Sequence, residues 1–191
     1  MNMPLKDTVI RNAFNGETFI FPTRQDDPAV AQFTVQLDPG GTGGGNALVH
    51  VHPLADETFT VVTGSLEVVI AGRHEMLYSG ETFTIQHGRP HYFANASAGQ
   101  TTATVSLSPA QRHLSFFHTF ATLTRERPNW FSAKGDPHLL LIALVLHSYP
   151  DHLYLWGPPI WLQKAVFRIL ARLAMWRGYS LPIIPHHTTD T

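Results

Sequence analysis

The stretch GGNALVHVHPLADETFTVVTG at 44–64 decides how the rest of the chain is interpreted. It places His50 and His52 one residue apart and puts Glu57 five positions further on. Alternate residues of a β-strand point to the same side, so both imidazoles are expected on one face. The residues 53–56 predict a tight turn, after which Glu57 begins an antiparallel strand next to the histidines.

A second stretch, GETFTIQHGRPHYFAN at 80–95, supplies another imidazole. Gly80 opens a predicted strand, 88–90 predict a turn, and His91 follows. Together the two stretches predict a site for one divalent transition metal ion, held by His50, His52, Glu57 and His91. Such ligands suit Fe, Mn, Ni, Cu, Co or Zn without selecting among them, and four protein ligands leave two positions of an octahedral ion open.

The surrounding sequence predicts a mainly β domain followed by helices. Short runs rich in Val, Thr, Phe and Ile alternate with glycine-containing turns, which indicates an antiparallel sandwich or barrel. The predicted strands are 17–21, 30–37, 47–52, 57–62, 66–70, 74–78, 81–86, 92–95 and 101–107. Helices are predicted at 111–123, 138–149 and 160–177. We therefore predict a barrel domain at 1–110 and a helical extension at 111–191 that packs on the barrel or on a dimer partner.

The two stretches resemble the sequence motifs of the cupins. The first cupin motif is matched at every spacing by Gly44, His50, His52, Glu57 and Gly64. The second is matched by Gly80, Gly88, His91 and Asn95. Its proline position holds Gln86, a departure expected to affect the rigidity of the turn more than metal ligation. Residues 56–64 look most like quercetin-dioxygenase-like cupins.

The resemblance implies a small single-domain cupin with an antiparallel double-stranded β-helix, the jelly-roll barrel, followed by the helical appendage. It implies a metal-dependent oxygenase or related oxidoreductase, in which Glu57 acts as a catalytic base by partly leaving the metal. Two alternatives stay open because fold does not give function. They are a non-catalytic module that binds or senses a small molecule, and an isomerase or hydrolase that uses the metal as a Lewis acid.

Apolar side chains are expected around the predicted metal site. Strand parity places Leu48, Phe59 and Val61 on the ligand face, and Phe83 and Phe93 are expected inside the barrel. Apolar walls next to a metal favour a small apolar or aromatic organic substrate. The alternative interpretation is that these five residues belong to the packed core.

Composition narrows the function classes further. The 191 residues include no cysteine, which excludes disulfides, thiolate zinc sites, iron–sulfur clusters and a cysteine nucleophile. Thirteen basic and 14 acidic residues give a net charge of −1, which argues against nucleic-acid binding. Charged residues make up 14%, against about 25% in typical domains, which indicates either an interface such as that of a homodimer or contact with a membrane.

Residues 1–13 hold no apolar run, and the longest apolar run is the eight residues 139–146, so we expect a cytoplasmic protein. The helix predicted at 160–177 is amphipathic and basic, with Lys164, Arg168 and Arg172 at every fourth position. Such a helix suits a membrane surface. We favour the alternative that it docks on the barrel or on the partner in a homodimer. The tail pair His186 and His187 could bind metal adventitiously.

Overall fold

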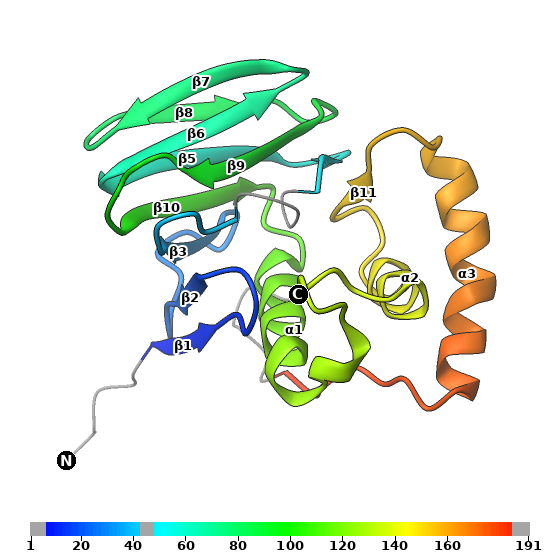
Figure 1. The fold of residues 1–191 in the computed structure, drawn as a ribbon. Helices are drawn as coiled ribbons and strands as arrows, with labels where there is room; N and C mark the ends of the chain where they lie inside the picture. Colours follow the sequence, from blue (N-terminus) through cyan, green and yellow to red (C-terminus); the bar gives the residue numbers. More distant parts are fainter. Residues whose placement is uncertain (1–6, 43–47, 185–191) are drawn as a thin grey trace.

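Two antiparallel β-sheets face each other in the computed structural model, which describes residues 7–42 and 48–184 (Figure 1). The strands are β1 Thr8–Arg11, β2 Glu17–Phe21, β3 Ala31–Leu37, β4 His50–Val51, β5 Asp56–Thr63, β6 Ser65–Ile70, β7 Arg73–Tyr78, β8 Thr82–Ile85, β9 His91–Asn95, β10 Thr101–Ser108 and β11 Tyr154–Leu155. One sheet has the order β1-β2-β3-β10-β5-β8, and the other has the order β11-β4-β9-β6-β7. The predicted mainly β jelly-roll architecture with C-terminal helices is confirmed.

The main core lies between the two sheets because their strands alternate buried and more exposed side chains. In β3, Phe33 and Val35 point into the core while the intervening Thr34 does not. β10 alternates in the same way along its eight residues. Burying one such large apolar side chain contributes roughly 1.5–3 kcal/mol, so the repeated alternation holds the two sheets together.

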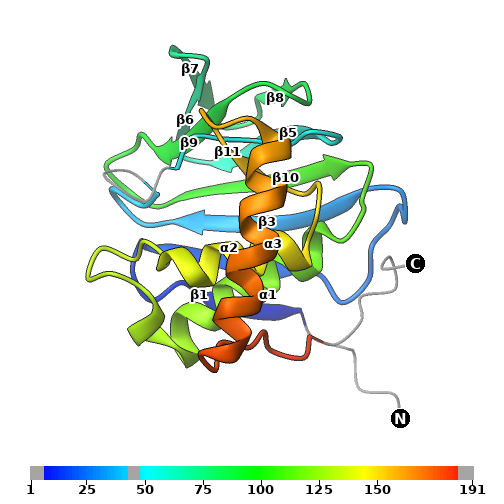
Figure 2. The ribbon, with the colours of Figure 1, turned by 90° about the vertical axis from the view of Figure 1, so that its right-hand side faces the viewer.

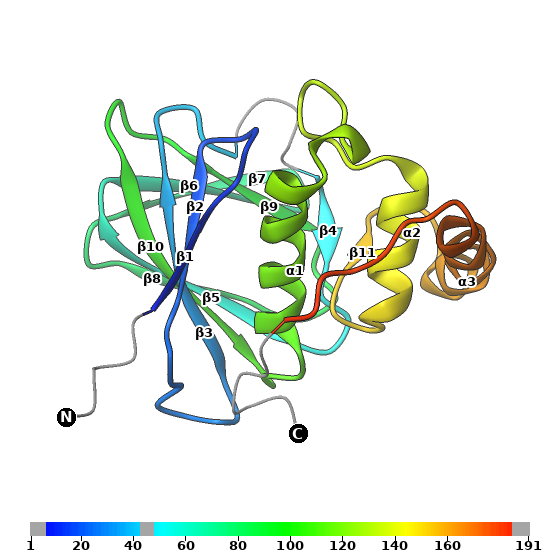
Figure 3. The ribbon, with the colours of Figure 1, turned by 90° about the horizontal axis from the view of Figure 1, so that it is seen from below.

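Four helical elements follow the sheets: α1 His113–Glu126, the 3-10 helix η1 Pro128–Trp130, α2 Leu139–Ser148 and α3 Ile160–Trp176. α1 packs against β1, β2 and β3, and α2 packs against α3. Figures 1 and 3 show α2 between the α1 side of the molecule and α3, which is outermost, and Figure 2 shows α3 running across this face. The bounds of α1, α2 and α3 differ from those predicted by at most three residues.

Three short strands depart from the sequence-based expectations. β1 and β11 were not predicted, since four and two residues are too few to establish an alternating pattern. The strand predicted at 47–52 is reduced to His50–Val51, and residue 47 lies outside the described residues. β11 pairs with β4, so the C-terminal extension adds a strand to the sheet that carries His50.

No helix in the described ranges is long and apolar enough to cross a bilayer. Homodimer formation, a cytoplasmic location and the division at residue 110 remain predictions.

Gly64 joins β5 to β6 at a point where the backbone leaves no room for a side chain. Its φ is +81°, in the left-handed region that favours glycine. A Cβ atom at this position would lie 2.9 Å from the Cα of Thr101 and even closer to the Thr101 hydroxyl. Gly72, between β6 and β7, has a similar φ of +82°, but nothing in the described chain lies within 4 Å of its Cβ position.

These two glycines make a matched pair for a stability test. Gly64→Ala is expected to lower the free energy of unfolding by about 2 kcal/mol or more, because backbone strain adds to a clash with Thr101. Gly72→Ala is expected to lower the free energy of unfolding by only roughly 1 kcal/mol, because it adds backbone strain without a clash. Urea unfolding of both variants measures the difference, and equal losses would contradict the close approach at Gly64.

Candidate metal centre

Residues of both sheets meet at the candidate metal centre. His50 on β4 and His91 on β9 are directly opposite each other in the strand register. His52 follows β4 immediately, and Glu57 lies on β5 of the facing sheet. One potential ligand atom from each of these four residues lies within 4.8 Å of all the others. The structure therefore brings together the four residues that the two sequence stretches predict as ligands.

Each of the three histidines is oriented by a backbone carbonyl. The acceptors of their Nδ1 atoms are the oxygens of Leu48 for His50 at 2.9 Å, of Arg89 for His91 at 2.8 Å and of His152 for His52. A carbonyl oxygen can only accept, so Nδ1 carries the proton in each ring. In all three imidazoles Nε2 is therefore the remaining nitrogen, with the orientation that such bonds give to metal-binding histidines. His91 Nε2 donates to Glu57, so a metal bound there would displace this proton.

The carboxylate of Glu57 is buried among these Nε2 atoms. Its Oε2 lies 2.7 Å from His91 Nε2 and 3.7 Å from His52 Nε2. Burial alone would raise the pKa of Glu57, but the hydrogen bond to His91 and the positive charge of the histidines outweigh it, and the pKa falls. Burial opposes the charged form of His91, yet Glu57 outweighs it and raises the pKa of His91.

The other two imidazoles favour the neutral form that binds metals. Burial, together with the charges of His91 and His52, lowers the pKa of His50 to about 3. Burial also lowers the pKa of His52, although the charge of Glu57 partly opposes it. His52 Nε2 is a buried atom with no hydrogen-bond partner in the described part of the chain. Such an orphaned lone pair beside a carboxylate fits a divalent ion, which would satisfy both.

Short contacts connect the loops that carry the ligands. The backbone N–H of Gly88 donates to the carbonyl of His52 at 2.8 Å. The backbone N–H and the Nδ1–H of His87 both donate to Asp56 Oδ1 at 2.8 Å. These two hydrogen bonds, the backbone one having the larger effect, hold the pKa of Asp56 below its ordinary value. The turn before His91 is thereby fixed to the segment between His52 and Glu57.

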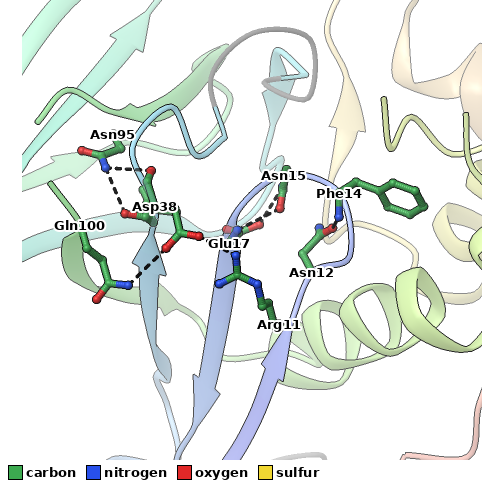
Figure 4. A network of polar contacts seen from close by, with 9 residues as sticks. Arg11, Asn12, Phe14, Asn15, Glu17, Asp38, Asn95 and Gln100 are labelled. Carbon is green, nitrogen blue, oxygen red and sulfur yellow. Dashed lines mark hydrogen bonds and ion pairs between the residues drawn. The ribbon is translucent and has the colours of Figure 1, made fainter. Parts of the chain in front are cut away.

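Asn95, the last residue of the second motif, has a structural role (Figure 4). Its Nδ2 donates to the carbonyls of Leu37 at 3.0 Å, Asp38 at 2.9 Å and Gly99 at 2.8 Å. These bonds tie the end of β9 to the end of β3. Gly44, the first residue of the first motif, lies outside the described residues.

The helical extension completes the surroundings of His52. The carbonyl that accepts from His52 belongs to His152, whose own Nδ1 donates to the carbonyl of Pro150 at 2.9 Å. His113 of α1 is fully buried with its ring centroid 5.4 Å from that of His52. Neither ring nitrogen of His113 has a hydrogen-bond partner among the described residues, and burial lowers its pKa to about 2. The sequence could not indicate the acceptor of His52, because it is a backbone carbonyl 100 residues away and every residue type has one.

An apolar cavity of about 160 Å³ opens onto His50. Its wall comes from β2, β9, β11, α1, α2 and the connecting loops, and includes Phe116, Phe117 and Phe120 of α1. Of the predicted pocket residues, Leu48 and Phe93 line this cavity. Phe59, Val61 and Phe83 do not line it, because they lie in or against the core between the sheets, where Phe59 packs on Phe93 with ring centroids 4.9 Å apart.

The same cavity is lined by a carboxyl group that was not predicted, that of Glu17. Glu17 is 6% exposed, and its Oε2 accepts a hydrogen bond of 3.2 Å from Asn15 Nδ2 (Figure 4). Burial raises the pKa of Glu17 to about 7, although the bond from Asn15 opposes the rise. The strand parity of β2 could have indicated this, since Glu17 shares its buried face with Phe19 and Phe21.

Comparison with known proteins identifies the family of this domain. Residues 33–107 match the family model of the cupin domain, and these residues carry all four members of the buried cluster. This part of the chain is a cupin domain. Among curated protein sequences, none matches the chain at a significant level.

Several solved structures resemble the chain at low identity. KdgF from Halomonas sp. shares 21% identity with this chain. The match covers 55% of this chain and 91% of KdgF, with a TM-score of 0.45. The nucleoside dehydratase Pac13 of Streptomyces shares 13%, covers 57% and 81%, and also has a TM-score of 0.45. A sugar phosphate isomerase of the cupin superfamily from Silicibacter pomeroyi shares 21%, covers 54% and 68%, and has a TM-score of 0.42.

Metal binding has a direct test. His50→Ala combined with His91→Ala is expected to abolish binding of one equivalent of divalent metal while the barrel stays folded, because the pair supplies two of four ligands. Metal analysis by mass spectrometry measures the loss. The control replaces His186 and His187 by Ala and removes adventitious sites only. Undiminished metal content in the first variant would contradict the site.

The raised pKa of Glu17 predicts a pH-dependent stability. Between pH 4.5 and about 7 the folded protein keeps a proton that the unfolded chain releases, so the free energy of unfolding falls as pH rises. Over this window the loss is roughly 3 kcal/mol. Glu17→Gln should therefore gain stability over wild type at about pH 8 but not at about pH 4.

Denaturant unfolding at both pH values measures the difference between variant and wild type. Glu75→Gln, at an exposed position of β7, is the control and should show no such trend. A constant difference between Glu17→Gln and wild type at both pH values would refute the raised pKa.

Proposed function

We propose that this cupin is a metal-dependent oxygenase or related oxidoreductase that acts on a small, largely apolar compound. The observation that carries the proposal is the apolar cavity next to His50, one of the four residues of the candidate metal centre. A compound bound there would lie beside the metal centre. A dry apolar cavity of roughly 150 Å³ accommodates benzene, so a volume of about 160 Å³ suits a single ring.

The residues divide into a metal-holding group and a substrate-holding group. His50, His52, Glu57 and His91 would hold the ion, which supplies oxygen chemistry if redox-active and polarises a carbonyl if not. The aromatic side chains of α1, together with Phe93, would orient the ring and exclude water. Glu57, already hydrogen-bonded to His91, is our proposed catalytic base.

Glu17 favours a second candidate function, isomerisation or hydrolysis with the metal as a Lewis acid. The sequence offered no acid–base group separate from the metal ligands, whereas Glu17 lines the cavity without belonging to the cluster. A carboxyl with a pKa of about 7 both gives and takes a proton near neutral pH. An isomerase or hydrolase should depend on Glu17 and consume no dioxygen.

Filling the cavity should separate substrate binding from metal binding. Ile142→Trp, at a partly buried cavity position on α2, is expected to abolish binding of single-ring compounds such as phenol and benzoate while leaving the metal content unchanged. Thermal stabilisation of the metal-loaded protein by these compounds measures binding. Val9→Trp, at an exposed position of β1, is the control. Equal stabilisation of Ile142→Trp and wild type would exclude the cavity as the binding site.

Oxygen uptake decides between the functions. With Fe, Mn, Ni, Cu or Co bound, the oxygenase proposal expects dioxygen consumption that depends on a bound ring compound and disappears in the variant His50→Ala with His91→Ala. Suppose instead that the zinc-loaded protein converts a compound without taking up oxygen, and that Glu17→Gln abolishes this conversion. That result would favour the second candidate. Stabilisation by a compound that stays unchanged with every metal would instead indicate a non-catalytic binding module.

A further inference from the structure

The outermost helix, α3, presents an apolar surface to solvent. Its buried side packs on α2 through Phe167, Ala171 and Ala174, while Gln163 bonds to the backbone of Leu155 and Pro158. On the opposite side Trp161 is 70% exposed, Ile169 68% and Trp176 78%. The spacing of eight and seven residues places these three side chains on one helix face. Leu162, Val166 and Leu173 extend the apolar surface along one edge, each being 37–39% exposed.

The other edge of this apolar face is cationic. Lys164, Arg168 and Arg172 are exposed and follow each other at intervals of four residues. They line a cleft between α2 and α3 together with His147 and Tyr154. Lys164 is paired with Asp151 at 2.7 Å, whereas Arg168 and Arg172 have no carboxylate partner among the described residues. Residues 152–184 contain four Lys or Arg and no Asp or Glu.

We propose that α3 docks this protein on a membrane surface rich in anionic phospholipid. Trp161, Ile169 and Trp176 would insert at the level of the headgroups, and the unpaired Arg168 and Arg172 would bind lipid phosphates. An interfacial helix combines these two features, an apolar face with tryptophan and a cationic border. This docking is independent of the metal centre and of the proposed reaction.

Charge complementarity favours an anionic surface over a second copy of this chain. In a twofold dimer the same patch faces itself, so each cationic edge would approach either the cationic edge or the apolar edge of the other copy. Neither arrangement brings a carboxylate of this patch to Arg168 and Arg172, since residues 152–184 contain none. Asp151, the carboxylate of this region, already pairs with Lys164. An anionic lipid surface would neutralise the unpaired cations while the apolar face leaves water.

Co-sedimentation with vesicles tests the proposal. The wild-type protein is expected to bind vesicles of phosphatidylcholine mixed with phosphatidylglycerol, to release them as salt rises, and not to bind phosphatidylcholine alone. Arg168→Glu combined with Arg172→Glu should reduce binding at least tenfold, since each cation contributes to attraction by an anionic surface. Trp161→Ser combined with Trp176→Ser should weaken binding while leaving its salt dependence.

The matched control carries the same change of net charge elsewhere. Arg24→Glu combined with Arg73→Glu alters two exposed arginines outside the helices and should bind the mixed vesicles as wild type does. Circular dichroism checks that every variant is folded. Binding that survives Arg168→Glu with Arg172→Glu, or an absence of binding to the mixed vesicles, would overturn the proposal. So would a wild-type dimer, seen by sedimentation, that Trp161→Ser with Trp176→Ser converts to monomer.

Discussion

Glu57 reaches from one sheet to three imidazoles carried by the other, and much of the structure serves to make this buried polar contact tolerable. Buried polar groups are costly unless each is hydrogen-bonded or bound to an ion. The backbone meets this requirement at one nitrogen of each of these three imidazoles, because the carbonyls of Leu48, Arg89 and His152 accept the Nδ1 protons. What remains is a set of inward-facing Nε2 atoms around a carboxylate, which is an arrangement that a divalent cation stabilises.

The four cluster residues and the jelly-roll fold were predictable because their signals are local. Two histidines at a spacing of two share a strand face, and glycine at 64 marks a turn that only glycine enters without strain and clash. The opposition of His50 and His91 was not predictable in register, since it depends on a pairing between a two-residue strand and β9. The hydrogen bond from His52 to the carbonyl of His152 was not predictable either, because every residue type has a backbone carbonyl.

The cavity shows where strand parity is insufficient. Parity placed Phe59 and Val61 on the same face as Glu57, and the structure buries all three there. The space between two facing sheets is filled by their own side chains, so Phe59 and Val61 follow the alternative interpretation and belong to the core. The open volume lies further out, where α1 and α2 cover the end of the barrel and contribute Phe116, Phe117 and Ile142. The extension therefore forms the second wall of the proposed binding site. α2 also touches α3, so the cavity wall and the outer helix share one supporting element.

The bond between His52 and the carbonyl of His152 also has a consequence for biosynthesis. The two residues are 100 positions apart, and translation at roughly 5–20 residues per second needs about 5–20 s to cover that distance. During this interval the barrel strands leave the ribosome while His52 lacks its acceptor. The barrel strands are thus synthesised before the candidate metal centre has all of its orienting contacts, because His52 gains its acceptor only after residue 152 has been added.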